Sequence, residues 1–158
     1  FTPVSALCTG VLARTGLETL ELIQGAAAHI RPTAVIAIDA LAARSRDRLC
    51  ATVQLSDTGL TPGSGVGNRR RAVDRPALGV PVIAVGVPTV IDGATLCADL
   101  LEEAGCPRQA LCGRGTDLFV TPQDIDQRVT ELGRMVGYGI TLALQRGLTL
   151  EDVTGLLG

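Results

Sequence analysis

The run AVIAIDALAARS, residues 34 to 45, places five apolar side chains in succession and then a carboxylate at Asp39. An apolar run without alternation is typical of a strand that is covered on both faces, as in a parallel sheet. A second run of this kind, VPVIAV at residues 80 to 85, has Pro81 near its start, where a strand tolerates proline. The two runs predict two buried strands.

Helical patterns flank these runs. Thr15 and Glu18 fit a capping box for a helix that continues to Ile30 and is stopped by Pro32. Strands that alternate with helices predict an α/β fold, a three-layer sandwich with a mostly parallel sheet. We expect a single domain over residues 1–158. Further helices are predicted over residues 40–49, 90–104, 121–147 and 149–157, and weaker strands over residues 3–8, 52–55 and 118–120.

The composition narrows the chemistry. All 14 basic residues are arginine, so a phosphate-loop lysine, a Schiff-base lysine and a Ser-Lys dyad are excluded within this chain. The only histidine, His29, falls near a predicted helix end, where a cation suits the helix dipole, and we expect it to be structural. Carboxylate chemistry remains, with neither cofactor nor metal. A net charge of −2 does not indicate a nucleic-acid binder.

Two further features concern the setting of the chain. The longest apolar run, residues 79–91, is interrupted by prolines and is shorter than the ~20 residues of a membrane span. The chain begins with Phe1 rather than Met, which indicates an N-terminally truncated or processed piece. The cysteines form no CxxC pair, and we expect buried free thiols in a reducing cytosol. They are Cys8, Cys50, Cys97, Cys106 and Cys112.

Asp39 is the first candidate for chemistry. In open α/β sheets, ligands gather beyond the carboxyl ends of the strands, and Asp39 directly follows such a strand. Burying a carboxylate is costly unless it is paired, hydrogen-bonded or protonated. Asp39 is therefore either a functional carboxylate or the N-cap of the predicted helix over residues 40–49. The pattern alone leaves both readings open.

The segment LSDTGLTPGSGVGNRRR, residues 55 to 71, carries three signals. Asp57-Thr58-Gly59 occurs in pepsin-like enzymes, but those are all-β, and a turn made by Asp and Gly is the simpler interpretation. The glycines that follow form GxGxG and precede arginines rather than a helix, so the dinucleotide fingerprint fails. Residues 69–71 are all arginine without interleaved aromatics, which makes a solvated face the default interpretation and argues against nucleic acid.

Taken together, long segments of the chain resemble the germination protease family of spore-forming bacteria. The segments that carry the resemblance are AIDALAARS (37–45), QLSDTGLTPGSGVGNRR (54–70), LGVPVIAVGVPTVID (78–92), PVSALCTGVLARTGLET (3–19) and LFVTPQDID (118–126). The resemblance implies an α/β endopeptidase with a fold similar to that of hydrogenase-maturation proteases. It implies a zymogen that acts in the cytoplasm of the spore core on small acid-soluble spore proteins.

The same resemblance implies a mechanism with two aspartates. One of them matches Asp39, and the other belongs to a segment upstream of residue 1, so we expect the 158-residue chain alone to be inactive. Asp57 is a candidate neighbour of Asp39. The substrates are cleaved in a glutamate-rich segment, which the arginines at the end of the glycine loop could hold. The candidate substrate-binding residues are Gly63, Gly65, Asn68, Arg69, Arg70 and Arg71.

The family also forms homo-oligomers, but residues 97–117 make a shorter connection than is usual in it. A family insertion is therefore expected to be missing, which puts that assembly in question. Two other functions stay open: a maturation endopeptidase for a metalloprotein, with a metal held by carboxylates, and a non-catalytic binding domain that lacks the other catalytic half.

Overall fold

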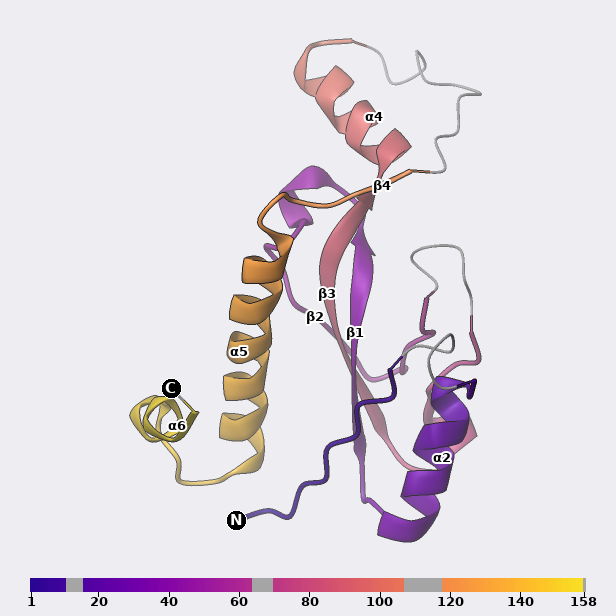
Figure 1. Cartoon of the computed structure of the whole chain (residues 1–158), viewed down its shortest axis with the longest axis vertical. Coiled ribbons are helices and arrows are strands. Elements are labelled where there is room, and N and C mark those ends of the chain that lie inside the picture. Colours follow the sequence, from indigo (N-terminus) through magenta and orange to yellow (C-terminus); the bar gives the residue numbers. More distant parts are fainter. Residues whose placement is uncertain (11–15, 64–69, 107–117, 158) are drawn as a thin grey trace. The chain divides into compact units, whose positions relative to one another are not determined.

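The computed structural model describes residues 1–10, 16–63, 70–106 and 118–157 (Figure 1). These residues cluster in two compact units. One, here called the sheet unit, is Cys8–Pro122; the other, the helical unit, combines Phe1–Leu7 with Gln123–Gly158. The helical unit contains α5 (Ile125–Leu144) and α6 (Leu150–Leu157). The sheet unit contains α2 (Thr19–Ile30), β1 (Val35–Ala43), a 3-10 turn (Arg46–Arg48), β2 (Gln54–Ser56), α3 (Arg75–Leu78), β3 (Val82–Asp92), α4 (Gly93–Glu103) and β4 (Phe119–Val120).

Strand β3 is the centre of the sheet, and each of the other strands in the described residues pairs with it. β1 runs parallel to β3 along its whole length, whereas β2 and β4 are antiparallel to it. The α/β prediction is therefore confirmed, but the sheet is mixed rather than mostly parallel. The parallel ladder is still the longest, and it joins the two apolar runs that predict parallel pairing.

The ladder between β1 and β3 has one irregularity, which lies at a proline. Leu41 is opposite Pro88 and Ala42 is opposite Val90, so Thr89 is left without a partner in β1. Proline has no N–H to donate to a ladder, and strands accommodate it where the pairing is interrupted. The Thr89 carbonyl accepts a hydrogen bond from the Thr121 hydroxyl at 2.8 Å.

The predicted helix over residues 40–49 is wrong. Asp39 does not end its strand: β1 continues to Ala43, and only the short turn Arg46–Arg48 has helical character. The alanines of this segment favour a helix in isolation. Here the parallel ladder with β3 supplies hydrogen bonds for the same backbone, and that tertiary pairing overrides local propensity.

Helix α2 ends as predicted but begins with a different cap. Its N-cap is Glu18, whose side chain accepts from the N–H of Glu21, while the Glu21 carboxylate accepts from the Glu18 N–H at 3.2 Å. Thr15, the predicted cap, lies outside the described residues. The helix ends at Ile30, with Arg31 in a left-handed conformation at φ 54°, and His29 is exposed in the last turn.

Other predicted boundaries shift by a few residues. Helix α4 begins at Gly93 rather than at residue 90, because β3 extends to Asp92, whose carboxylate caps the helix by accepting from the Thr95 N–H at 2.9 Å. Helix α5 begins after Asp124 rather than at Thr121. The predictions of α6 and of a strand near β4 are confirmed.

The N-terminal strand predicted over residues 3–8 is absent, although this segment is described. Instead, Thr2 is tied to Gln145, the residue after α5. The Thr2 N–H donates to Gln145 Oε1 at 2.7 Å, and Gln145 Nε2 donates to the Thr2 carbonyl at 2.9 Å. The N-terminal segment is thus held to the helical unit by a reciprocal pair of hydrogen bonds.

The core of the sheet unit is aliphatic, as the scarcity of aromatic residues predicts. Leu20, Val73 and Val82 form its buried cluster, with Val35 and Ala37 of β1 among the residues that pack against it. The expected burial of the thiols is wrong for three of the four described cysteines. Cys50 is half-buried, while Cys8, Cys97 and Cys106 are exposed, and none of these four is in a disulfide.

Within the described residues, no helix is both long and apolar enough to cross a membrane.

Gly86 of β3 provides a test of the packing between the two long strands. A Cβ at this position would clash with Leu41 Cδ1 and would lie 2.8 Å from Leu41 Cγ. We expect Gly86→Ala to reduce the free energy of unfolding of the sheet unit by about 1–3 kcal/mol through overpacking. Urea denaturation followed by NMR signals of this unit measures the change.

Two controls accompany this measurement. Gly25→Ala in α2 adds a methyl group where no atom lies within 4 Å, so it should stabilise by about 0.5–1 kcal/mol. In a Leu41→Ala background, Gly86→Ala should cost much less than in the original chain. An equal cost in both backgrounds would show that Leu41 is not the obstacle.

Candidate functional site

Asp39 lies in the middle of β1, directly opposite Gly86 of β3. Alternate side chains of a strand share a face, so Asp39 continues the face on which Val35 and Ala37 pack into the core. Its side chain is half-buried. The carboxylate of Asp39 therefore lies at the edge of an apolar core, inside a strand rather than after it.

One main-chain donor holds this carboxylate: the Ala40 N–H donates to Asp39 Oδ1 at 3.0 Å. Burial raises the pKa of Asp39 above its usual 3.8, while the backbone N–H groups of Ala40 and Gly63 act in the opposite direction and offset only part of the rise. The ionised carboxylate is consequently both oriented and more basic than an exposed aspartate.

The loop that carries Gly63 is closed at its base. Leu60 and Val73 form an antiparallel bridge, with N–H to O distances of 3.0 and 2.8 Å. One step further out, the Arg70 N–H donates to the Pro62 carbonyl at 3.2 Å. We call these four residues, together with Gly63, the neck of the glycine loop. The neck fixes the chain on both sides of residues 64–69, which lie outside the described residues.

The Asp57-Thr58-Gly59 tripeptide forms a turn, as predicted. Thr58 N–H donates to the Ser56 hydroxyl at 3.1 Å, and Gly59 has φ 79°. A Cβ on Gly59 would lie 2.8 Å from Asp74 Cα, so the turn requires glycine at this position.

The structure does not bring Asp57 next to Asp39. Ser56 is opposite Ala84 of β3, so Asp57 follows the end of β2 at the level of residue 83, whereas Asp39 is at the level of Gly86. Three residues along the sheet and two strand spacings across it amount to roughly 14 Å. A direct hydrogen bond between the two carboxylates is excluded at this separation, and any role of Asp57 has to act from a distance.

The arginines at the end of the loop do not behave alike. Arg70 Nη1 lies 3.3 Å from Glu18 Oε1, and the two side chains are only 23% and 29% exposed. Arg70 is thus paired within the protein, and its predicted role in holding the substrate stays a prediction. Arg71 is exposed. Of the other predicted substrate-binding residues, Gly65, Asn68 and Arg69 lie outside the described residues.

Pattern reading misses the partners that organise this site. It gives Glu18 only a helix-capping role, and it gives Pro62 none. The sequence offers one signal for these partners, which is that Pro62 stands directly before Gly63. The φ of 71° at Gly63 requires a glycine.

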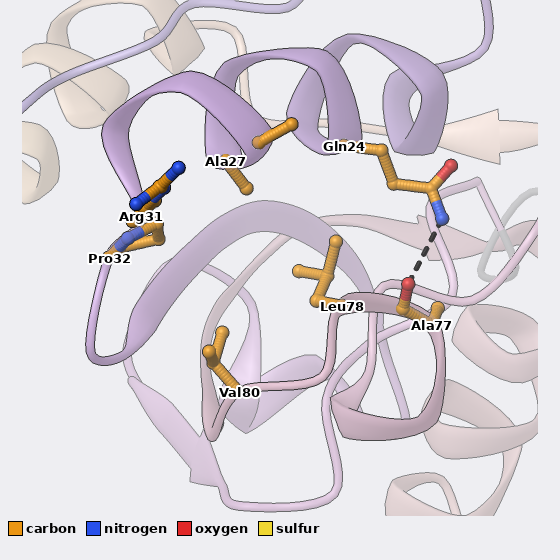
Figure 2. Close-up of a pocket in the computed structure, with 8 residues that line it drawn as sticks. Gln24, Ala27, Arg31, Pro32, Ala77, Leu78 and Val80 are labelled. Atoms are coloured by element: carbon orange, nitrogen blue, oxygen red, sulfur yellow. Dashed lines mark hydrogen bonds between the residues drawn. The ribbon is translucent and has the colours of Figure 1, made fainter.

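A cavity of about 330 Å³ lies elsewhere in the sheet unit (Figure 2). Gln24 on its wall donates through Nε2 to the Ala77 carbonyl at 3.0 Å, joining α2 to α3. Pro32 and Val80 place the cavity before the amino ends of β1 and β3, and Asp39 is not among its lining residues. This cavity is therefore separate from the candidate carboxylate.

Among residues 1–10, 16–63, 70–106 and 118–157, no three His, Cys, Asp or Glu side chains gather as a metal site would require.

Comparisons with known proteins converge on one family. The family model described as germination protease matches residues 1–104. A germination protease of Caldanaerobacter subterraneus is 39% identical over 181 residues, covering 98% of this chain and 56% of the relative. One from Clostridium perfringens is 37% identical over 182 residues, with the same coverage. One from Halalkalibacterium halodurans is 52% identical over 211 residues, covering 97% of this chain and 57% of the relative.

The chain thus spans about half the length of the curated relatives that it matches. The matched regions of 181 to 211 residues are also longer than the chain of 158 residues. The relatives therefore carry residues within the matched region that this chain lacks. This agrees with the expectation of a missing insertion, without showing where it lies.

The raised pKa of Asp39 predicts how the stability depends on pH. A folded-state pKa above the unfolded value means that the carboxyl group favours folding below about pH 3.8 and opposes it once both states are ionised. We expect Asp39→Asn to be more stable than the original chain at pH 7, with the difference disappearing towards pH 3. Urea denaturation at several pH values, followed by NMR signals of the sheet unit, measures this.

Asp152 serves as a control of opposite sign. The Thr149 hydroxyl and N–H lower the pKa of Asp152, so its contribution to stability is present at neutral pH and is lost on acidification. Asp152→Asn should therefore lower the stability of the helical unit at pH 7 and have little effect at low pH. A pH-independent effect of Asp39→Asn would contradict the assignment for Asp39.

Proposed function

The chain belongs to the germination protease family, and on that premise we propose that it carries one of the two catalytic aspartates of a spore endopeptidase. The proposed substrates are the small acid-soluble spore proteins, degraded in the cytoplasm of the germinating spore. The observation that carries this proposal is Asp39: a half-buried carboxylate at the edge of the core, held by a hydrogen bond from the Ala40 N–H.

The proposed mechanism uses two carboxylates in different protonation states. Asp39, in its ionised form, accepts a proton from the water that attacks the scissile carbonyl carbon. The second aspartate, which the family resemblance assigns to a part outside this chain, donates a proton to the carbonyl oxygen. Collapse of the tetrahedral intermediate breaks the C–N bond, and the proton held by Asp39 passes to the leaving amine. As the C=O double bond re-forms, one hydroxyl of the intermediate returns its proton to the second aspartate, which restores the starting protonation states.

The environment of Asp39 suits the role of base. A base works best when its pKa approaches the working pH, and burial moves Asp39 in that direction. The hydrogen bond from the Ala40 N–H meanwhile limits the orientations that the carboxylate can adopt. No observation favours the maturation endopeptidase or the non-catalytic binding domain over this assignment.

For recognition of an acidic substrate, we propose Arg71. It lies between Arg70 and Val73 of the neck and is exposed, unlike its neighbour Arg70. An exposed guanidinium can grip a substrate glutamate with paired hydrogen bonds. Arg69, for which the sequence predicts the same role, stays a prediction.

The role of Asp39 is tested in an exchange enzyme, in which this chain replaces the matched part of the full-length Halalkalibacterium halodurans relative. We expect Asp39→Asn to lower kcat on a small acid-soluble spore protein by about 100-fold or more, because a paired acid and base act as a unit. Gel-based cleavage rates measure the loss. Asp47→Asn, at an exposed carboxylate of the same unit, is the matched control and should leave kcat unchanged.

The 158-residue chain by itself should not cleave the same substrate, since the proposal gives it one carboxylate of the pair. Cleavage by the isolated chain that is abolished by Asp39→Asn would refute the two-part active site. An unchanged kcat for Asp39→Asn in an active exchange enzyme would refute the catalytic role.

The role of Arg71 is tested in the same enzyme by Arg71→Gln. KM for an acidic peptide should rise about 2- to 5-fold at low ionic strength, as expected for one exposed ion pair, and the difference should shrink at high salt. kcat should stay the same. Arg75→Gln, at an exposed arginine of α3, is the control. A KM that does not change would leave Arg71 as a solvated surface charge.

A further inference from the structure

The side chain of Leu41 lies beside Asp39, on the flank that faces β3. Both residues belong to β1 and are two positions apart, so they share one face of the sheet. A Cβ on Gly86 would clash with Leu41 Cδ1 and would lie 2.8 Å from Leu41 Cγ and 3.3 Å from Leu41 Cδ2. Leu41 therefore leans over Gly86 and fills the space that a side chain at position 86 would take.

Gly86 is the residue directly opposite Asp39 in the parallel ladder. Paired residues of neighbouring strands project from the same face, and the strands lie roughly 5 Å apart. The apolar end of Leu41 is therefore about one strand spacing from the Asp39 side chain. It covers the β3 side of the carboxylate, which the glycine alone would leave open to water.

The hydrogen bond on the carboxylate lies on the other side. The Val35 N–H donates to the Pro81 carbonyl at 2.9 Å, so Val35 and every second residue after it up to Leu41 direct their main-chain groups towards β3. The Ala40 N–H consequently points to the outer edge of β1, and this group donates to Asp39 Oδ1 at 3.0 Å. The two contacts act together, since one closes the β3 side and the other draws the carboxylate towards the outer edge.

We propose that Leu41 is a positioning residue for Asp39: its side chain, seated over Gly86, shields the carboxylate from water on the β3 side and leaves it open towards the outer edge of β1. The attacking water and the scissile peptide then reach the carboxylate from that edge. This consequence for catalysis rests on the proposed function, whereas the shielding depends only on the packing between β1 and β3.

Charged groups beside Asp39 would mask such an effect, and its described neighbours on this face of the sheet are uncharged. They are Ala37 and Leu41 of β1, Ala84, Gly86 and Pro88 of β3, and Gln54 of β2. The neck of the glycine loop carries Arg70, which is paired with Glu18, and Asp57 is roughly 14 Å from Asp39. Burial is the largest cause of the raised pKa of Asp39, and no charged group is among the causes.

The first test follows the ¹³C NMR titration of the Asp39 side-chain carboxyl signal in this chain, assigned with Asp39→Asn. Leu41→Ala should admit water, which stabilises the ionised carboxylate, so the pKa of Asp39 should fall towards 3.8. Leu41→Met keeps an apolar side chain of similar volume and should preserve most of the raised value. An unchanged titration in folded Leu41→Ala would overturn the proposal.

A matched control separates shielding from a general loss of packing. Leu78→Ala removes the same atoms from a half-buried leucine of α3, which lines the cavity before the amino ends of β1 and β3 (Figure 2). It should leave the Asp39 titration unchanged. A fall in the pKa as large as that in Leu41→Ala would assign the effect to loosening of the whole unit and overturn the proposal.

A second variant decides the question if Leu41→Ala does not fold. Leu41→Thr suits a strand and places a hydroxyl group where the apolar shield was. The pKa of Asp39 should again fall, because a polar neighbour favours the ionised form. A titration that matches the original chain would contradict the shielding.

The second test uses the exchange enzyme defined above. The reaction needs ionised Asp39, so kcat declines on the acid side as this group is protonated. In Leu41→Ala the acid limb should move to lower pH, and the plateau of kcat should fall about 3- to 30-fold, because the carboxylate is a weaker base and is less well oriented. Leu41→Met should largely restore both.

A lower plateau with an unmoved acid limb would show that Leu41 acts only through stability, and it would overturn the proposal. The NMR titration measures the shielding even if the exchange enzyme is inactive. The positioning role and the proposed function can therefore fail separately.

Discussion

The structure of the sheet unit depends on the parallel ladder between β1 and β3. Each of the other strands is attached to β3, and the register of the ladder decides what lies beside Asp39. Gly86 is opposite the carboxylate, and Leu41 occupies the space that a larger residue at position 86 would need. A shift by one residue would move the Asp39 side chain to the opposite face of the sheet.

The parts of this arrangement that the sequence predicts are those with a local signal. The two apolar runs predict β1 and β3, Pro32 predicts the end of α2, and the long motifs identify the family. The extension of β1 beyond Asp39 has no such signal, because its alanine-rich segment favours a helix until a partner strand is present. The mixed character of the sheet is equally invisible, since β2 and β4 are too short to reveal their direction.

In the candidate site, too, the features with a local sequence signal are predicted and those that depend on tertiary contacts are not. Asp39 stands out in the sequence as a charge within an apolar environment, and the structure shows it half-buried within β1. Its place opposite Gly86 joins residues that are far apart in sequence, and it is set by the register of the ladder. The three consecutive arginines look equivalent in the sequence. In the structure Arg70 pairs with the partly buried carboxylate of Glu18, whereas Arg71 is exposed.

The neck of the glycine loop is closed by its own hydrogen bonds, which do not involve the side chains of the residues beyond it. Two successive sets of hydrogen bonds close the chain before position 64 and after position 69. Residues inserted, deleted or exchanged between these positions would therefore leave the neck itself in place. A chain built in this way can vary the part of the loop beyond the neck without disturbing the sheet unit beneath it. Protein engineers could use positions 63 and 70 as the joints for grafting foreign recognition loops onto this scaffold.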